Sequence, residues 1–218
     1  MSTYTPQTRA AEAARLLAER YPDAACSLDA GNDAWRLLVM ARLSAQCTDA
    51  RVNIVSVPLF ERFPTPESMA KADITDIEDI VRPCGLYHTK AHDIKAASEM
   101  IVTRFGGRVP DNMPDLLSLP GVGRKIANLI LGDVFGKGGI VADTHCIRIC
   151  GRLGFYDAAK KDPVLTERVM SSLLPESEQS EFCHRLVMFG RDVCTARSPK
   201  CSECELCIIC NSFLQNKG

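Results

Sequence analysis

Helical periodicity runs through almost all of this sequence, and it limits the chain to an all-α fold. Between residues 7 and 193, apolar side chains recur at helical spacing, and Asp, Pro and Gly residues separate the periodic segments. No stretch alternates apolar and polar residues as a half-buried strand does. The pattern predicts about ten or eleven helices without internal repeats. The clearest periodic segments are 7–21, 33–46, 50–62, 66–72, 75–82, 87–105, 162–174 and 177–193.

Composition excludes several classes of protein. Hydrophobic residues make up 46% of the 218 residues and charged residues 24%, which is ordinary for a globular chain and excludes a disordered one. No apolar run approaches the length of a membrane span. The first residues, MSTYTPQTR, lack the apolar core of a secretory signal. We therefore expect a cytoplasmic protein that does not contact a membrane.

The net charge of −1 argues only weakly against a polyanion as partner, because the charges are unevenly distributed. Residues 119–155 carry five basic residues against two acidic ones. A smaller basic group, Arg191, Arg197 and Lys200, lies near the C-terminus. A random fluctuation of a few charges would look the same, so the chemistry must come from the motifs.

The segment LPGVGRKIAN (119–128) predicts a tight turn between two helices. Gly121 and Gly123 allow positive φ and close backbone approach, and Val122 lies between them. The helix that follows presents free N–H groups and a positive dipole end, which together favour a phosphate. A bare Pro-Gly-x-Gly would be an ordinary helix–helix turn. Because Arg124 and a lysine directly follow the glycines, we interpret the segment as a helix-hairpin-helix. Such a motif binds a DNA backbone without reading its sequence.

Two residues near this turn have the chemistry of a catalytic pair. Lys125 lies in the first turn of the new helix, where partial desolvation and the positive helix end would favour the neutral, nucleophilic amine. Asp143, in VADTH (141–145), starts the next helix and is expected to be its N-cap. A solvated phosphate-binding lysine and a simple capping aspartate are the plainer alternatives. If the intervening loop folds back, both side chains can face one cleft.

The C-terminal tail contains a cysteine cluster with metal-ligand spacing. Five of the eleven cysteines lie within 17 residues, at positions 194, 201, 204, 207 and 210. In a chain without a secretory signal, such crowding indicates metal ligation rather than disulfides. Four thiolates at these intervals fit either a [4Fe–4S] cluster or a zinc ion. The spacing alone leaves the choice of metal, and the role of Cys207, open.

Taken together and in this order, these motifs resemble the endonuclease III family. Its members are bifunctional DNA glycosylase/lyases of the helix-hairpin-helix, Gly-Pro-Asp superfamily. The resemblance runs from about residue 35 to residue 210. It is carried by LLVMARLSAQCTD (37–49), CGLYHTKA (84–91), LPGVGRKIAN, VADTH and the tail Cys-x6-Cys-x2-Cys-x5-Cys.

The resemblance implies two helical domains that flank a DNA-binding cleft. A six-helix domain with the hairpin would span 27–137, and a second domain, 1–26 plus 138–218, would carry a C-terminal iron–sulfur loop. The family pattern implies a [4Fe–4S] cluster bound by Cys194, Cys201, Cys204 and Cys210, with Cys207 as an extra cysteine.

The resemblance also assigns roles to single residues. Lys125 matches the nucleophile and Asp143 the catalytic carboxylate. Gln46 matches the residue that fills the space left by a flipped nucleotide, and Leu86 matches the wedge at the opposite strand. On their own, Gln46 would be a polar helix-end residue and Leu86 a core leucine. The expected contacts to DNA are Gln46, Leu86, Gly121, Val122, Gly123, Arg124, His145, Arg197 and Lys200.

The implied activity is the removal of oxidised pyrimidines in base excision repair, followed by β-elimination 3′ to the abasic site. The substrate would be double-stranded DNA with a damaged pyrimidine or an abasic site, bound by a monomer and associated with the nucleoid in a prokaryote. The adenine glycosylase branch is disfavoured, because its lysine position is typically serine and LSAQCTD lacks its glutamate. A non-catalytic DNA-binding or redox-sensing iron–sulfur protein would not need Lys125 and Asp143.

Overall fold

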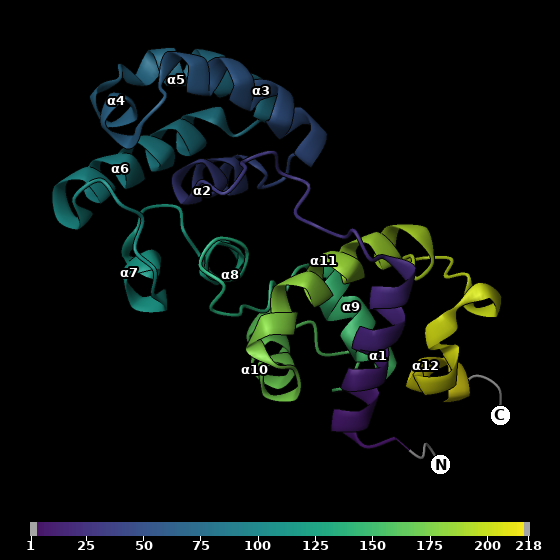
Figure 1. Cartoon of the computed structure of the whole chain (residues 1–218). Helices are drawn as coiled ribbons and strands as arrows, with labels where there is room; N and C mark the ends of the chain where they lie inside the picture. The colour runs from purple at the N-terminus through teal and green to yellow at the C-terminus, as the bar shows by residue number, and fades with distance from the viewer. Residues whose placement is uncertain (1–3, 216–218) are drawn as a thin grey trace. The chain divides into compact units, whose positions relative to one another are not determined.

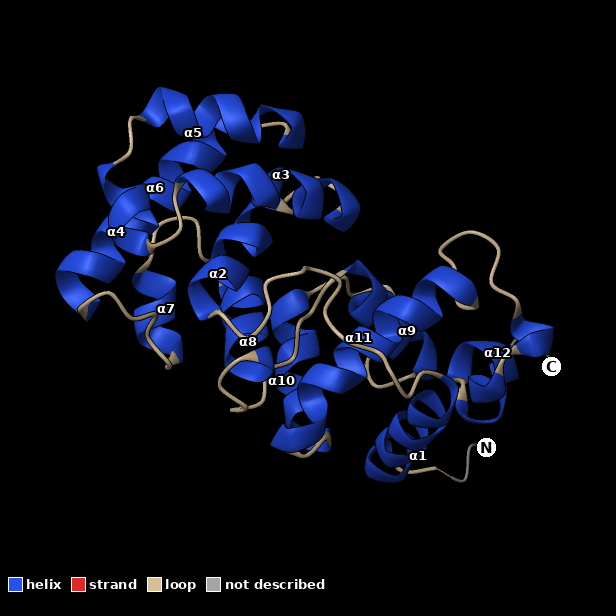
Figure 2. Cartoon of the chain, turned by 45° about the horizontal axis from the view of Figure 1, so that its top comes forward, coloured by secondary structure: helices blue, strands red, loops and turns tan. Residues whose placement is uncertain are grey.

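The computed structural model describes residues 4–215, and within this range it contains helices and no strands (Figure 2). The all-α prediction is confirmed. The chain divides into two compact units. We call residues 26–135 the hairpin unit, and residues 4–25 with 136–215 the cysteine unit. The family resemblance placed these boundaries at 27 and 137, one or two residues away.

The hairpin unit is built from seven α-helices rather than the six that the resemblance implies. Two of the seven, α4 and α7, are short helices of six residues each. The helices are α2 (Ala34–Leu43), α3 (Asp49–Arg62), α4 (Pro66–Lys71), α5 (Ile74–Val81), α6 (Tyr87–Phe105), α7 (Met113–Ser118) and α8 (Arg124–Asp133), and the 3-10 helix η1 (Arg82–Cys84) precedes α6.

The core of the hairpin unit lies around the long helix α6. Helices α2, α4 and α5 pack against it, and α8 packs against α2 and α7 (Figure 1). Side-chain caps fix where several of these helices begin: Asp33 accepts from the N–H groups of Trp35 and Arg36, and Thr48 accepts from that of Arg51. The buried apolar side chains at the centre are Leu38, Leu59, Met69, Ile77, Ile94, Ile101 and Ile130.

The cysteine unit joins the N-terminal helix to the second half of the chain. Helix α1 packs against α10 and α11, and α9 packs against α10, α11 and α12. Phe182, Leu186 and Phe189 from α11 are among its fully buried side chains. Its α-helices are α1 (Pro6–Arg20), α9 (Thr144–Leu153), α10 (Pro163–Leu173), α11 (Glu176–Asp192) and α12 (Asn211–Gln215), with the 3-10 helices η2 (Cys201–Glu203) and η3 (Glu205–Ile209).

Residues 194–215 form more regular structure than their sequence predicts. No apolar period was found there, yet the chain forms η2, η3 and α12 around Leu206 and Ile209, which are both buried. Elements of three to five residues are too short to produce a periodic pattern. No helix of residues 4–215 is long and apolar enough to cross a membrane.

Candidate active site and cysteine centre

The segment 119–128 forms the predicted hairpin between two helices. Helix α7 ends at Ser118, the N–H of Val122 donates to the carbonyl of Leu119 over 3.1 Å, and α8 begins at Arg124. Gly121 has a φ of +73°, which a residue with a Cβ rarely adopts. The helix-hairpin-helix of the predicted fold is therefore present, and its turn needs glycine at position 121.

A second observation explains the glycine at this position. A Cβ on residue 121 would lie 2.7 Å from Asp93 Cβ and 2.8 Å from Arg42 Nε. Arg42, from α2, donates through Nε to Asp93 Oδ2, from α6, over 2.7 Å. The hairpin turn thus rests directly on an ion pair that joins two other helices. The sequence does not indicate this pair, because neither residue carries a local signal.

The start of α8 has the features of an anion site. Gly123, the N-cap, has extended backbone and provides no side-chain cap to the N–H groups of the first turn. Arg124 and Lys125 follow and are both exposed, whereas Ala127 and Ile130 are buried. The exposure of Lys125 corrects the expectation of partial desolvation, because its side chain leaves the helix on the solvent face.

Asp143 is the N-cap of α9, as the sequence predicts. Its Oδ1 accepts from the N–H of Cys146 over 2.7 Å, and its backbone is extended. The side chain is half-buried. Asp143 therefore has a fixed position at the start of α9 in the cysteine unit. Lys125 lies at the start of α8 in the hairpin unit.

His145 and two arginines of α9 hold the cysteine unit together. Arg148 Nη2 lies 3.1 Å from His145 Nδ1 and donates to the carbonyl of Cys194 over 2.9 Å. Arg152 Nη1 donates to the Cys194 sulfur over 3.2 Å and to the carbonyl of Thr195 over 2.7 Å. The positive surplus counted for residues 119–155 included both arginines. Their charges are directed to the cysteine loop, so the surplus available to a polyanion is smaller.

Gln46 and Leu86 share an unusual backbone conformation. They are the two residues other than glycine with positive φ among residues 4–215, at 55° and 48°. Both are exposed, Leu86 by 58%, so Leu86 is not a core leucine. Left-handed backbone at non-glycine residues is strained and clusters at functional sites. Sequence propensity could not reveal it, since neither residue favours this conformation.

Five cysteines surround a cavity of about 360 Å³ in the cysteine unit. Burial raises the pKa of the Cys204 thiol to about 12 and also raises that of Cys210, and neighbouring cysteines add to both shifts. Within residues 4–215, no three ligand-type side chains converge closely enough to hold a single metal ion. The lining includes Cys194, Cys201, Cys204, Cys207 and Cys210 together with Arg152 and Lys200.

Arg197 and Lys200 are both exposed in the loop between the first two of these cysteines. Lys200 Nζ lies 3.8 Å from Asp192 Oδ1, a long and solvated ion pair. Both cations are therefore accessible to a phosphate on the surface of the cysteine unit.

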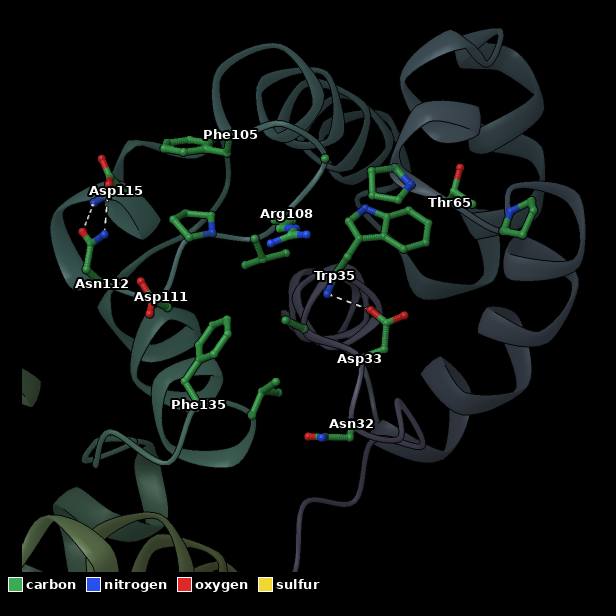
Figure 3. A pocket seen from close by; sticks show the side chains of 17 residues that line it. Asn32, Asp33, Trp35, Thr65, Phe105, Arg108, Asp111, Asn112, Asp115 and Phe135 are labelled. Atoms are coloured by element: carbon green, nitrogen blue, oxygen red, sulfur yellow. Dashed lines mark hydrogen bonds between the residues drawn. The ribbon is translucent and has the colours of Figure 1, made fainter.

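A larger cavity of about 890 Å³ lies elsewhere in the hairpin unit and contains none of the predicted site residues (Figure 3). Several of its polar groups already have structural partners. Asp33 caps α2, and Asn112 caps α7 by accepting from the N–H of Asp115 over 3.0 Å. The Trp35 indole N–H donates to Ser98 Oγ over 3.0 Å. We do not assign this cavity to the active site.

Comparison with known proteins matches both units. Residues 39–176 match the family model described as "HhH-GPD superfamily base excision DNA repair protein". Endonuclease III from Synechocystis sp. is 42% identical over 205 residues, covering 94% of this chain and 92% of that protein. Two solved structures, a non-covalent endonuclease III–DNA complex and a trapped endonuclease III–DNA covalent intermediate, each have a TM-score of 0.89 and 35% identity. Both matches cover 99% of this chain. They cover 99% of the chain in the non-covalent complex and 100% of the chain in the covalent intermediate.

Proposed function

The chain belongs to the endonuclease III family of the HhH-GPD superfamily of base excision DNA repair proteins, and from this premise we propose that Lys125 and Asp143 are the catalytic residues of a bifunctional DNA glycosylase and AP lyase. The observation that carries the proposal is the start of α8, where an exposed lysine is the second residue after the hairpin turn. The similar endonuclease III structures include a covalent intermediate with DNA, which requires a nucleophile on the protein.

The chemistry begins with extrusion of the nucleotide, because the glycosidic bond cannot be reached inside a stacked duplex. Neutral Lys125 attacks C1′ through Nζ as the bond between C1′ and the base breaks. The ionised carboxylate of Asp143 stabilises the positive charge that develops on the sugar. Loss of the Nζ proton and opening of the ring at O4′ give a Schiff base between Lys125 and C1′.

Strand cleavage follows from the Schiff base. The imine withdraws electrons from C2′, so a base removes a C2′ proton and the electron pair expels the phosphate at C3′. Hydrolysis of the remaining imine releases the unsaturated aldehyde and regenerates Lys125. In this series of steps, the nucleophile that the protein supplies for the β-elimination is the Lys125 amine.

The other predicted residues would hold the distorted duplex. The hairpin residues Gly121, Val122, Gly123 and Arg124 would bind a phosphate at the positive end of α8. Gln46 would fill the space left by the flipped nucleotide, and Leu86, exposed and apolar, would stack at the opposite strand. In the cysteine unit, His145, Arg197 and Lys200 would contact the backbone of the same duplex.

The cysteine centre fits a [4Fe–4S] cluster held by Cys194, Cys201, Cys204 and Cys210. The thiols line a single cavity of about 360 Å³, which has room for a polynuclear group, and thiolates are the ligands that such a cluster takes. When bound, such a cluster ties the tail together and can exchange one electron. Arg152, bonded to the Cys194 sulfur, would stabilise the thiolate that binds it.

We infer oxidised pyrimidines as the lesion class and a monomer as the working form, acting in the cytoplasm and, in a prokaryote, associated with the nucleoid. The test uses duplexes with one thymine glycol, one abasic site, or one adenine opposite 8-oxoguanine. The proposal predicts base removal followed by strand cleavage for the thymine glycol duplex, strand cleavage alone for the abasic duplex, each with an unsaturated 3′ end, and no reaction with the adenine duplex. Cleavage restricted to the adenine duplex would place the protein in the adenine glycosylase branch. Binding of all three without reaction would indicate a non-catalytic protein.

A further inference from the structure

Lys90 is a fully buried lysine that the proposed chemistry does not use. It is the fourth residue of α6, its exposed fraction is 0%, and it is among the largest fully buried side chains of the chain. Lysine is almost never fully buried without a partner, because removing an ammonium group from water is expensive. Its retention therefore calls for a physical reason.

The partner of this lysine is a backbone carbonyl. Nζ donates to the carbonyl oxygen of Cys84 over 2.8 Å. The Cys47 and Cys84 thiols lie nearby, and the Arg42 guanidinium is the neighbouring cation. Burial lowers the pKa of Lys90, but a neutral amine donates the same hydrogen bond, so the contact does not depend on the charge.

The bonded carbonyl belongs to the strained turn that presents Leu86. Cys84 is followed by Gly85, with φ +67°, and then by Leu86, with φ +48°. The backbone N–H of Lys90 donates to the Leu86 carbonyl over 3.0 Å. Lys90 thus holds the turn at both ends, through its side chain at Cys84 and through its backbone at Leu86.

The same contact reaches the second strained residue. The thiol of Cys47, the residue directly after Gln46, lies close enough to the Cys84 thiol to contribute, after burial, to the raised pKa of Cys84. The turn that presents Gln46 and the turn that presents Leu86 therefore meet at the Cys47 and Cys84 side chains, next to Lys90 Nζ. Strained backbone persists only where its surroundings hold it in place.

We propose that Lys90 is a positioning residue that holds Leu86, and through Cys84 and Cys47 also Gln46, in the conformation needed to occupy the duplex gap. It touches neither the substrate nor the reacting atoms. The expected effect of Lys90 on catalysis rests on the proposed function. Its effect on the conformation of the two turns can be measured without DNA.

The test compares Lys90→Met with Lys95→Met. Methionine has a similar length and removes the donor, and replacing a buried charge with an apolar group of similar volume is often tolerated by the fold. Lys95 is the matched control, since it also lies on α6 and donates to a backbone carbonyl, that of Ala70 over 2.7 Å, away from the strained turns. If Lys90→Met does not fold, Lys90→Leu, which also removes the donor, takes its place.

The first readout is hydrogen exchange of the free protein. Lys90→Met should speed exchange in residues 44–48 and 84–88 and leave residues 94–101 of α6 unchanged, and Lys95→Met should leave all three segments unchanged. Exchange as slow as in the wild type in both turns would overturn the proposal. So would faster exchange along the whole of α6, which a general loss of packing would produce.

The second readout is single-turnover kinetics. Base removal from thymine glycol, which needs a stable flipped state, should fall about tenfold in Lys90→Met, the effect expected when one strained residue is no longer held. Cleavage at a preformed abasic site should fall much less. An equal loss on both substrates would overturn the positioning role. Inactive wild-type protein would refute the proposed function, while the exchange data would still decide the structural part.

Discussion

Arg42 and Asp93 form an ion pair in which Nη2 lies 2.6 Å from Oδ2, with both side chains mostly buried. The pair occupies the space that a Cβ on residue 121 would enter. Helices α2 and α6 thereby contact and support the hairpin turn through this ion pair. The turn has its conformation because of contacts that are distant in the sequence, in addition to its own glycines.

Gly121→Ala is therefore expected to destabilise the hairpin unit more than an ordinary Gly→Ala change. It combines left-handed backbone strain of about 1–2 kcal/mol with displacement of the ion pair, so we expect a loss of about 2–4 kcal/mol in the free energy of unfolding and weaker binding to abasic DNA. Chemical denaturation and fluorescence anisotropy would measure the two effects.

Gly106→Ala is the matched control for this prediction. Gly106 has a similar φ of +61°, but no atom lies within 4 Å of an added Cβ. Its substitution should show the backbone strain alone, about 1–2 kcal/mol, with DNA binding unchanged. Equal effects of the two substitutions would mean that the Arg42–Asp93 pair does not support the turn.

Asp143→Asn should separate the capping role of this residue from its catalytic role. The asparagine side-chain oxygen can still accept from the Cys146 N–H, so the free energy of unfolding should change by less than about 0.5 kcal/mol. The charge is lost, so base removal should fall by about 100-fold or more. Denaturant titration and single-turnover cleavage of thymine glycol DNA provide both numbers.

Asp162→Asn provides the comparison, because Asp162 caps α10 in the same unit by accepting from the N–H of Val164 over 2.8 Å. It should leave both stability and base removal unchanged. If Asp143→Asn retained wild-type base removal, Asp143 would be a cap and nothing more.

The cysteine centre leads to a prediction about metal content. Cys204→Ser should lose the visible absorption of the cluster and most of the iron, whereas Cys207→Ser should retain about four iron atoms per chain. Both sulfurs line the same cavity, which makes them a matched pair. Iron analysis of the two purified variants distinguishes them, and zinc in the wild-type protein in place of iron would contradict the assignment.

The sequence predicts well those features that are set by local interactions. The capping role of Asp143 and the helix start at Arg124 depend on residues within one turn, and both agree with the structure. The strained turns at Gln46 and Leu86 do not follow from local propensity, because they depend on tertiary contacts such as that of Lys90. A lysine in an amphipathic helix is ordinarily solvated, so its burial could not be foreseen.

Charge was the least informative sequence signal, because the partners of a charged side chain also depend on tertiary contacts. Arg148 and Arg152 add to a basic segment in the sequence, but in the structure they donate to carbonyls and to the sulfur of the cysteine loop. The partial desolvation expected for Lys125 was wrong as well, since the face of a helix on which a first-turn residue lies depends on which neighbours pack beneath it.

The most direct test of the central claim is borohydride trapping on a duplex with one preformed abasic site. Reduction converts a Schiff base into a stable protein–DNA adduct, and an abasic substrate makes the result independent of lesion preference. Wild type and Lys71→Gln, which removes an exposed lysine of the same unit outside the predicted site, should both form the adduct, and Lys125→Gln should form none. An adduct with Lys125→Gln at the wild-type yield would contradict the assignment of Lys125 as the nucleophile.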